Sequence, residues 1–152
     1  MKSIILQSIT VATILLLLPS TAHASPVDEA IVQALDEHPG GVQTAWNEVS
    51  WDDGDVTLTI APRSLLATFS SFGRCDRGAF CIFSGYGGVG KKVTYRSCGT
   101  YSTSVLGQPV RSIVNSRSGN TVRGKNGSTI VVTVGPSGAR NVYSPINTVE
   151  CR

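Results

Sequence analysis

The sequence predicts a mainly β protein: a β-sandwich of two Greek keys, preceded by a short helix and a β-hairpin. The chain is rich in Gly, Val, Thr and Ser, which favour strands and turns over helices. After residue 74, short apolar runs alternate with glycine-rich turns. Gln108–Asn115 also resembles Ser144–Cys151, and both follow the order Pro, aliphatic, polar, hydroxyl, aliphatic. Because a hairpin is expected before each copy, the repeat predicts two Greek keys.

Residues 1–24 have the pattern of a secretory signal peptide. Lys2 is basic, residues 4–18 are almost wholly apolar, and Ala22-His23-Ala24 matches a cleavage site. The apolar run is shorter than the roughly 20 residues that a membrane-spanning helix needs. We therefore expect a secreted protein whose mature chain begins at Ser25, in surroundings where nucleotide cofactors are scarce.

Residues 25–74 are expected to form an acidic region of helix, hairpin and linker. Ser25 can cap a helix that Pro26 begins, and its apolar stripe is Val27, Ile31, Ala34 and Leu35. Residues 39–41 should end this helix. Residues 42–51 and 55–60 are predicted strands, joined by a turn at 52–54. Residues 61–74 are expected to be a linker that docks through Leu65, Leu66, Phe69 and Phe72.

Residues 75–152 are predicted to form the β-sandwich. In the first half, strands at 80–83 and 91–95 flank the stretch Ser84-Gly85-Tyr86-Gly87-Gly88-Val89-Gly90. In the second half, strands at 130–134 and 140–143 flank a turn at 135–138. Asn126-Gly127 is predicted to mark another hairpin turn.

Gly85–Gly90 also matches G-x-G-x-x-G, a pattern of dinucleotide-binding sites, and two lysines follow it. Such a site needs the glycines between a strand and a helix, so that the helix N-terminus meets the phosphates. Here Val93-Thr94-Tyr95 continues as a strand. The stretch is therefore interpreted as a folded hairpin turn, in which glycine adopts backbone angles that strain other residues.

The titratable residues do not form a recognisable catalytic set. Four cysteines in an exported chain predict two structural disulfides, in any of three connectivities: Cys75, Cys81, Cys98 and Cys151. His38, expected at a helix end, is the one histidine after residue 24 and lacks an adjacent nucleophile in sequence. Asp52 and Asp53 are expected to form a turn rather than a catalytic pair. We expect neither an enzyme nor a metal or cofactor.

Charge divides the chain into an acidic and a basic part. Residues 25–55 contain eight acids and no Lys or Arg, whereas residues 56–152 contain twelve basic residues and two acids. This division favours a basic module with an acidic cover. Several basic residues are candidates for a shared face that binds an anionic cell envelope: Lys91, Lys92, Arg96, Arg111, Arg117, Arg123, Lys125 and Arg140.

Two motifs resemble a known family. Phe80-x-x-Phe83-x-Gly85, followed by Ser112-Ile113, is similar to the Greek-key signature of βγ-crystallins. Residues 75–85 and 110–115 resemble the secreted bacterial metalloproteinase inhibitors of peptidase inhibitor family I36, which share that fold. Residues 39–41 and 47–54 resemble the leader region of longer members of the family.

The resemblance implies roles for particular residues. It assigns structural roles in the two keys to Phe80, Phe83, Gly85, Ser112 and Thr148. It also implies that Cys75 pairs with Cys81, which leaves Cys98 for Cys151. Microbial crystallin domains often bind calcium through carboxylates. The matching positions here contain none, so no calcium is expected: Gly107, Gln108, Arg111 and Ser112, then Tyr143, Ser144, Asn147 and Thr148.

The function implied by the resemblance is inhibition of an extracellular protease, with a metalloprotease as the expected target. A rigid, disulfide-braced loop would enter the active-site cleft. The family's second short disulfide loop has no counterpart after Cys98, so no inhibitory residue is assigned. The loops at Gly99–Pro109 and Gly119–Ser128 are the candidates. The alternative is a monomeric module that binds the cell envelope or another polyanion, but not nucleic acid or nucleotide. A further possibility is that residues 25 to about 71 are a pro-segment.

Overall fold

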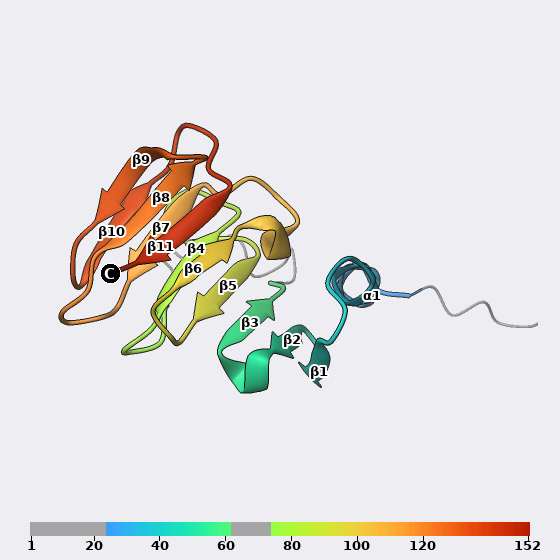
Figure 1. Cartoon of the computed structure of the whole chain (residues 1–152). Coiled ribbons are helices and arrows are strands. Elements are labelled where there is room, and N and C mark those ends of the chain that lie inside the picture. The colour runs from blue at the N-terminus through green and yellow to red at the C-terminus, as the bar shows by residue number, and fades with distance from the viewer. Residues whose placement is uncertain (1–23, 62–73) are drawn as a thin grey trace, which may run out of the picture.

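The computed structural model describes residues 24–61 and 74–152, which form two antiparallel β-sheets of seven and four strands and one short helix (Figure 1). The predicted mainly β class is confirmed. No helix in the described ranges is long and apolar enough to cross a membrane. Residues 1–23 of the expected signal peptide, and Leu65, Leu66, Phe69 and Phe72 of the expected linker, lie outside these ranges.

Helix α1 (Pro26–Glu37) begins as its sequence predicts. Ser25 and Asp28 form a reciprocal capping box, in which each side chain accepts a hydrogen bond from the backbone N–H of the other residue. Val27, Ile31 and Ala34 are buried along one face, and this face packs beside β2. Because the cap and the stripe are local signals, the sequence was sufficient to place this helix.

The predicted strand at 42–51 is two strands. β1 (Val42–Ala45) turns back through Trp46-Asn47 and pairs with β2 (Glu48–Trp51). Asn47 fixes this turn, because its side-chain amide donates to the Ile60 carbonyl at 3.0 Å and its own carbonyl accepts from the Ile60 N–H at 2.9 Å. After a short 3-10 turn, η1 (Asp52–Gly54), the predicted return strand is present as β3 (Val56–Thr59).

The larger sheet joins the acidic region to the rest of the chain. Its order is β1-β2-β3-β5-β4-β7-β10, with β4 (Phe80–Phe83), β5 (Lys92–Tyr95), β7 (Ser112–Asn115) and β10 (Gly138–Asn141). β3 pairs with β5 over four residues, and its Leu58 is buried. The acidic region is therefore three strands of a continuous sheet, and its removal as a pro-segment would expose β5.

The smaller sheet has the order β6-β11-β8-β9, with β6 (Thr100–Ser102), β8 (Val122–Asn126), β9 (Thr129–Val134) and β11 (Thr148–Cys151). The predicted pairing of residues 130–134 with 140–143 is wrong. β9 instead pairs with β8 through the predicted Asn126-Gly127 turn, where Gly127 has φ of 58°. Beyond the turn at 135–138, β10 crosses to the larger sheet and pairs with β7.

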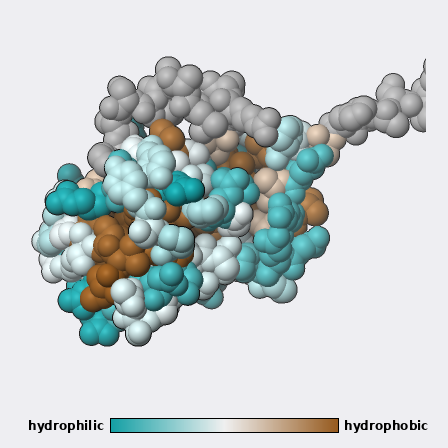
Figure 2. Space-filling view, turned by 90° about the horizontal axis from the view of Figure 1, so that it is seen from above, coloured by the Kyte–Doolittle hydropathy of each residue, from teal (hydrophilic) through white to brown (hydrophobic). Residues whose placement is uncertain are grey.

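The core lies between the two sheets. Phe80, Ile82 and Ile113 of the larger sheet are fully buried, as are Val122 and Val149 of the smaller one. The surface seen from above is mostly hydrophilic, and its largest hydrophobic patch lies on the side away from α1 (Figure 2). Two disulfides, Cys75–Cys81 and Cys98–Cys151, have the pairing that the resemblance implies.

Candidate functional site

The glycine-rich stretch forms a folded turn between β4 and β5, as interpreted from the sequence. Ser84 donates its backbone N–H to the Lys91 carbonyl at 3.0 Å, and Gly85 donates to the Val89 carbonyl at 2.9 Å. A Cβ atom at Gly85 would lie 2.8 Å from the Val89 carbonyl oxygen, so no other residue fits there without a shift. The turn leads into a strand; Gly85 and Gly90 allow it to pack closely on itself, and Gly87 and Gly88 adopt positive φ.

Ser112 of β7 ties this turn to the sheet. Its hydroxyl accepts a hydrogen bond from the buried Gly88 N–H at 2.9 Å and donates to the Gly85 carbonyl at 2.7 Å. Phe80 and Phe83 of β4, the strand that leads into the turn, are both buried, and Phe80 belongs to the main core cluster. Thr148 has a different environment from Ser112, since its hydroxyl donates to the neighbouring Asn147 side chain at 3.2 Å.

Beside the turn, two exposed tyrosines and an arginine from separate segments meet. The rings of Tyr86 and Tyr143 are stacked with centroids 5.4 Å apart, although 46% and 76% of the two residues remain exposed. The Arg111 guanidinium lies 5.5 Å from the Tyr86 ring centroid and donates to its hydroxyl at 3.2 Å. Asn141 accepts from the Gly87 N–H at 2.9 Å and so fixes β10 to the turn. These contacts connect the cluster to the turn and to β10, and its rings remain open to solvent.

A short exposed tip leads into this cluster. Residues 107–109 are exposed, whereas Leu106 and Val110 on either side are buried. Leu106 ends a 3-10 turn, η3 (Ser104–Leu106), and Gly107 reverses the chain with φ of 63°. Arg111 then donates its N–H to the Phe83 carbonyl at 2.8 Å. We call Tyr86, Arg111 and Tyr143, together with the tip at 107–109, the hairpin-end surface.

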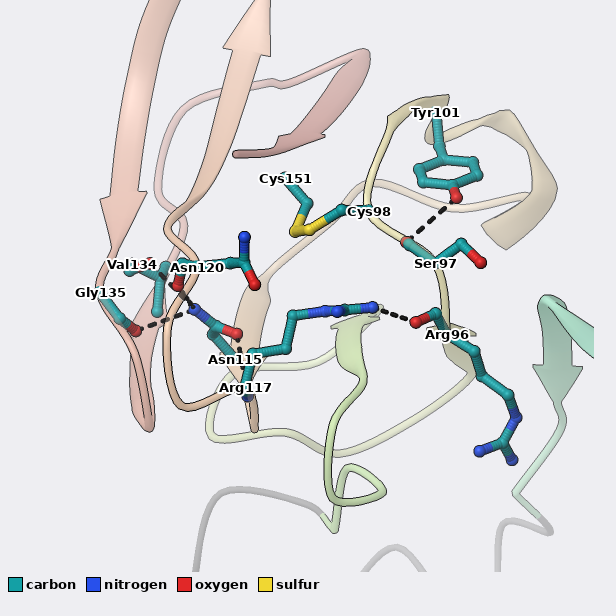
Figure 3. The surroundings of a disulfide bond; sticks show 10 residues. All are labelled: Arg96, Ser97, Cys98, Tyr101, Asn115, Arg117, Asn120, Val134, Gly135 and Cys151. Carbon is teal, nitrogen blue, oxygen red and sulfur yellow. Dashed lines mark hydrogen bonds between the residues drawn. A yellow bond between two sulfur atoms is a disulfide. The ribbon is translucent and has the colours of Figure 1, made fainter.

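The segment before the tip is braced by the second disulfide (Figure 3). Cys98 is bonded to Cys151 of β11, and the Cys151 N–H donates to the Gly99 carbonyl at 2.8 Å. The Tyr101 hydroxyl donates to the Ser97 carbonyl at 3.1 Å, as Figure 3 shows. The candidate loop at Gly99–Pro109 is therefore held at both ends, by a covalent bond and by buried side chains.

The other candidate loop, Gly119–Ser128, is largely a strand. Its residues 122–126 are β8, which lies between β11 and β9, and its Val122 and Gly124 are buried. Hydrophobic periodicity missed β8 because Arg123 and Lys125 alternate with a glycine. Only the two ends of this segment are left as exposed loops, and they lie at opposite ends of one strand.

The predicted basic residues occupy several environments rather than one face. Arg96 pairs with Asp76 at 2.7 Å, and Lys125 lies 3.8 Å from Glu150, which also pairs with Arg152. The hydrogen bond from the Arg152 side chain is the main cause that lowers the pKa of the Glu150 carboxyl. Arg111 belongs to the hairpin-end surface. The Lys91 ammonium lies close to the tip of this surface, 3.8 Å from the position that a Cβ atom would take at Gly107.

The remaining sequence candidates lie at the C-terminal end of α1 and in η1. His38 ends α1, and its carbonyl accepts from the Trp51 indole N–H at 2.9 Å. Asp52 and Asp53 lie in η1, each with positive φ. Within residues 24–61 and 74–152, His, Cys, Asp and Glu form no group of three that could hold a metal ion. The positions matched to calcium ligands include Arg111, which is engaged by Tyr86.

Comparison of the chain with protein-family models, curated proteins and solved structures finds no significant match. The fold thus defines the class directly: a two-sheet, mainly β protein braced by two disulfides. Sequence reasoning missed Tyr86 and Tyr143 as a pair. The repeat contained a signal, because Tyr143 directly precedes the second copy just as Gly107 of the tip directly precedes the first. However, Tyr86 and Tyr143 meet only because β10 crosses to the larger sheet.

Proposed function

We propose that this protein is a secreted inhibitor of an extracellular protease, with a metalloprotease as the target, and that it binds through the hairpin-end surface. The observation that carries the proposal is the stacked Tyr86–Tyr143 pair, with Arg111 against it, beside a tip whose two flanking residues are buried. Tyr and Arg are the residue types that dominate binding energy at protein interfaces. A rigid tip also loses little conformational entropy on binding.

The strand order supports the proposed kinship with βγ-crystallin-like inhibitors. Residues 80–115 give three strands to the larger sheet and β6 to the smaller one. Residues 122–151 give three strands to the smaller sheet and β10 to the larger one. This reciprocal exchange is what two intertwined Greek keys would produce, and the Ser112 hydroxyl bonded to the turn fits the serine of their signature. The family assignment is our inference from these features and the resemblance.

The direct test is an inhibition titration. Mature protein from Ser25 onward is added in increasing amounts to a thermolysin-like metalloprotease and to representative serine and cysteine proteases. We expect the metalloprotease activity to fall to zero near one equivalent of inhibitor. If every protease kept its full activity in the presence of excess folded protein, the proposed inhibition would be rejected.

A second candidate, binding of an anionic cell envelope, is favoured by the positive charge at the same surface. Arg111 belongs to this surface, and the Lys91 ammonium lies near Gly107 of its tip. Retention on purified cell wall and on vesicles with anionic lipid should then fall steeply between low and high salt. Retention that does not depend on salt, or no retention, would reject this candidate.

A further inference from the structure

A second concave surface lies at the opposite end of β5 from the hairpin turn. It is a cleft of about 400 Å³, between the end of α1 and β2 on one side and the segment of β6 and η3 on the other. Its lining includes Trp51, Tyr95 and Tyr101, together with the acidic side chains of Glu37 and Asp52. The volume falls within the range of small-ligand sites, and neither Lys nor Arg is among the lining residues.

The aromatic side chains of the cleft are fixed in place. Tyr101 packs on Tyr95 with ring centroids 4.6 Å apart, and Tyr95 packs in turn on the buried Phe80 at 4.8 Å. Across the cleft, the Trp51 indole donates to the His38 carbonyl at 2.9 Å. A Cβ atom at Gly41 would lie 2.6 Å from the same indole, so only glycine lets the ring occupy its position. The walls are therefore preorganised.

The cleft is lined by two carboxylates, and His38 is its other titratable side chain besides the tyrosines. Glu37 and Asp52 are exposed at its edge, and Asp55 accepts from the Ser97 hydroxyl at 2.6 Å behind Tyr101. Burial raises the pKa of Tyr101, the negative charges of Asp55 and Asp52 raise it further, and Arg117 opposes them. Aromatic faces attract cations, and flanking carboxylates add Coulomb attraction. The cleft has the composition of a cation site.

We propose that this cleft binds the side chain of an arginine or lysine residue in a partner peptide. The apolar stem would lie along Val56 and Val105, which also line the cleft, while the charged head meets the carboxylates of Glu37 and Asp52. The two proposed sites use different charged residues, Glu37 and Asp52 in the cleft and Arg111 at the hairpin-end surface, although Ser104 and Val105 of the cleft closely precede the tip at 107–109. The cleft gives the acidic region of the chain a binding role of its own.

The experiment uses Trp51 as the reporter. In a Trp46→Phe protein, which removes the exposed tryptophan of the β1–β2 turn, Trp51 is the only indole. N-acetyl-arginine methylamide and N-acetyl-lysine methylamide are titrated while Trp51 fluorescence and its indole N–H NMR signal are recorded. N-acetyl-citrulline methylamide is the control probe, since it has nearly the shape of the arginine probe without the charge. Comparing the lysine probe with the arginine probe shows whether the cleft recognises the guanidinium group or any cation.

We expect saturable binding of the arginine probe in the millimolar range and at least fivefold weaker binding of the citrulline probe. Glu37→Gln/Asp52→Asn should weaken the arginine probe roughly three- to tenfold at low salt, whereas Glu29→Gln, at the other end of α1, should leave it unchanged. Equal binding of arginine and citrulline probes, an unchanged affinity in the double variant, or no shift of the Trp51 signals would each overturn the proposal. If the protein failed to inhibit any protease but still bound the arginine probe as described, the proposal of a cation-binding cleft would still hold.

Discussion

The hydroxyl of Ser112 accepts a hydrogen bond from the backbone N–H of Gly88 at 2.9 Å, across 24 residues of sequence. The same hydroxyl donates to the Gly85 carbonyl at 2.7 Å. One side chain on β7 therefore holds the turn between β4 and β5 against the sheet. Because Tyr86 lies inside this turn, the bond also sets where the exposed tyrosine pair can form.

Replacing Ser112 with alanine should lower the free energy of unfolding by about 1–3 kcal/mol, because the buried Gly88 N–H loses its partner. Chemical denaturation measures this change. Ser118→Ala, at an exposed position, is the matched control and should stay within about 0.5 kcal/mol of the parent. Equal stability of the two variants would show that the Ser112 bond has no structural role.

Alanine at Gly124 should destabilise the smaller sheet by about 1–3 kcal/mol through overpacking. A Cβ atom there would lie 2.7 Å from Val132 and 2.9 Å from Ile146. Gly119 faces open space and serves as the control, where alanine should be neutral. Thermal unfolding of the two variants decides this. If Gly124→Ala melts at the parent temperature, the close contact of β8 and β9 at this residue is refuted.

The Cys98–Cys151 bond should contribute more stability than the Cys75–Cys81 bond. The two bonds close sequence separations of 53 and 6 residues, for which the chain-entropy model gives about 4 and about 2 kcal/mol. We expect Cys98→Ser/Cys151→Ser to have a lower unfolding free energy than Cys75→Ser/Cys81→Ser. The reverse order, measured in urea, would contradict this account of the bracing.

Stability should fall at alkaline pH through Tyr95. Burial is the main cause that raises the pKa of Tyr95 above its ordinary value of 10.0, and the neighbouring Tyr101 raises it further. The unfolded chain releases this proton first, so the stabilisation is fully present below pH 10 and is lost as pH rises toward the folded-state pKa. Between pH 9 and 11, Tyr95→Phe should lose less stability than the parent does. Parallel pH curves for the two proteins would refute this.

Local signals in the sequence were sufficient for α1 and for the turn at 84–91. The capping box and the positions of the glycines act within a few residues, and these determine the backbone there. The second half was harder, because residues 135–138 look like a hairpin turn while β10 has its partner in β7. No local pattern encodes that choice, since it depends on which sheet gains the strand.

The same limit applies to the two candidate surfaces. Tyr86 and Tyr143 meet only because β10 joins β7, and the cleft between Trp51 and Tyr101 exists only because β3 pairs with β5. The sequence identified the glycine-rich turn and the acidic region, but their neighbours come from distant segments. The repeat of a proline before each returning strand was the one non-local signal available.

The most direct test of the account compares inhibition constants for three proteins against the same metalloprotease: the parent, Tyr86→Ala/Arg111→Ala and Glu37→Gln. Circular dichroism first establishes that all three are folded. We predict tight inhibition by the parent and an inhibition constant raised about thirtyfold or more in the double variant, as expected of interface hot spots. The constant should be unchanged for Glu37→Gln, which lines the cleft and is not part of the hairpin-end surface. Equal inhibition by the parent and the Tyr86→Ala/Arg111→Ala variant would contradict the assignment of the binding site to the hairpin-end surface.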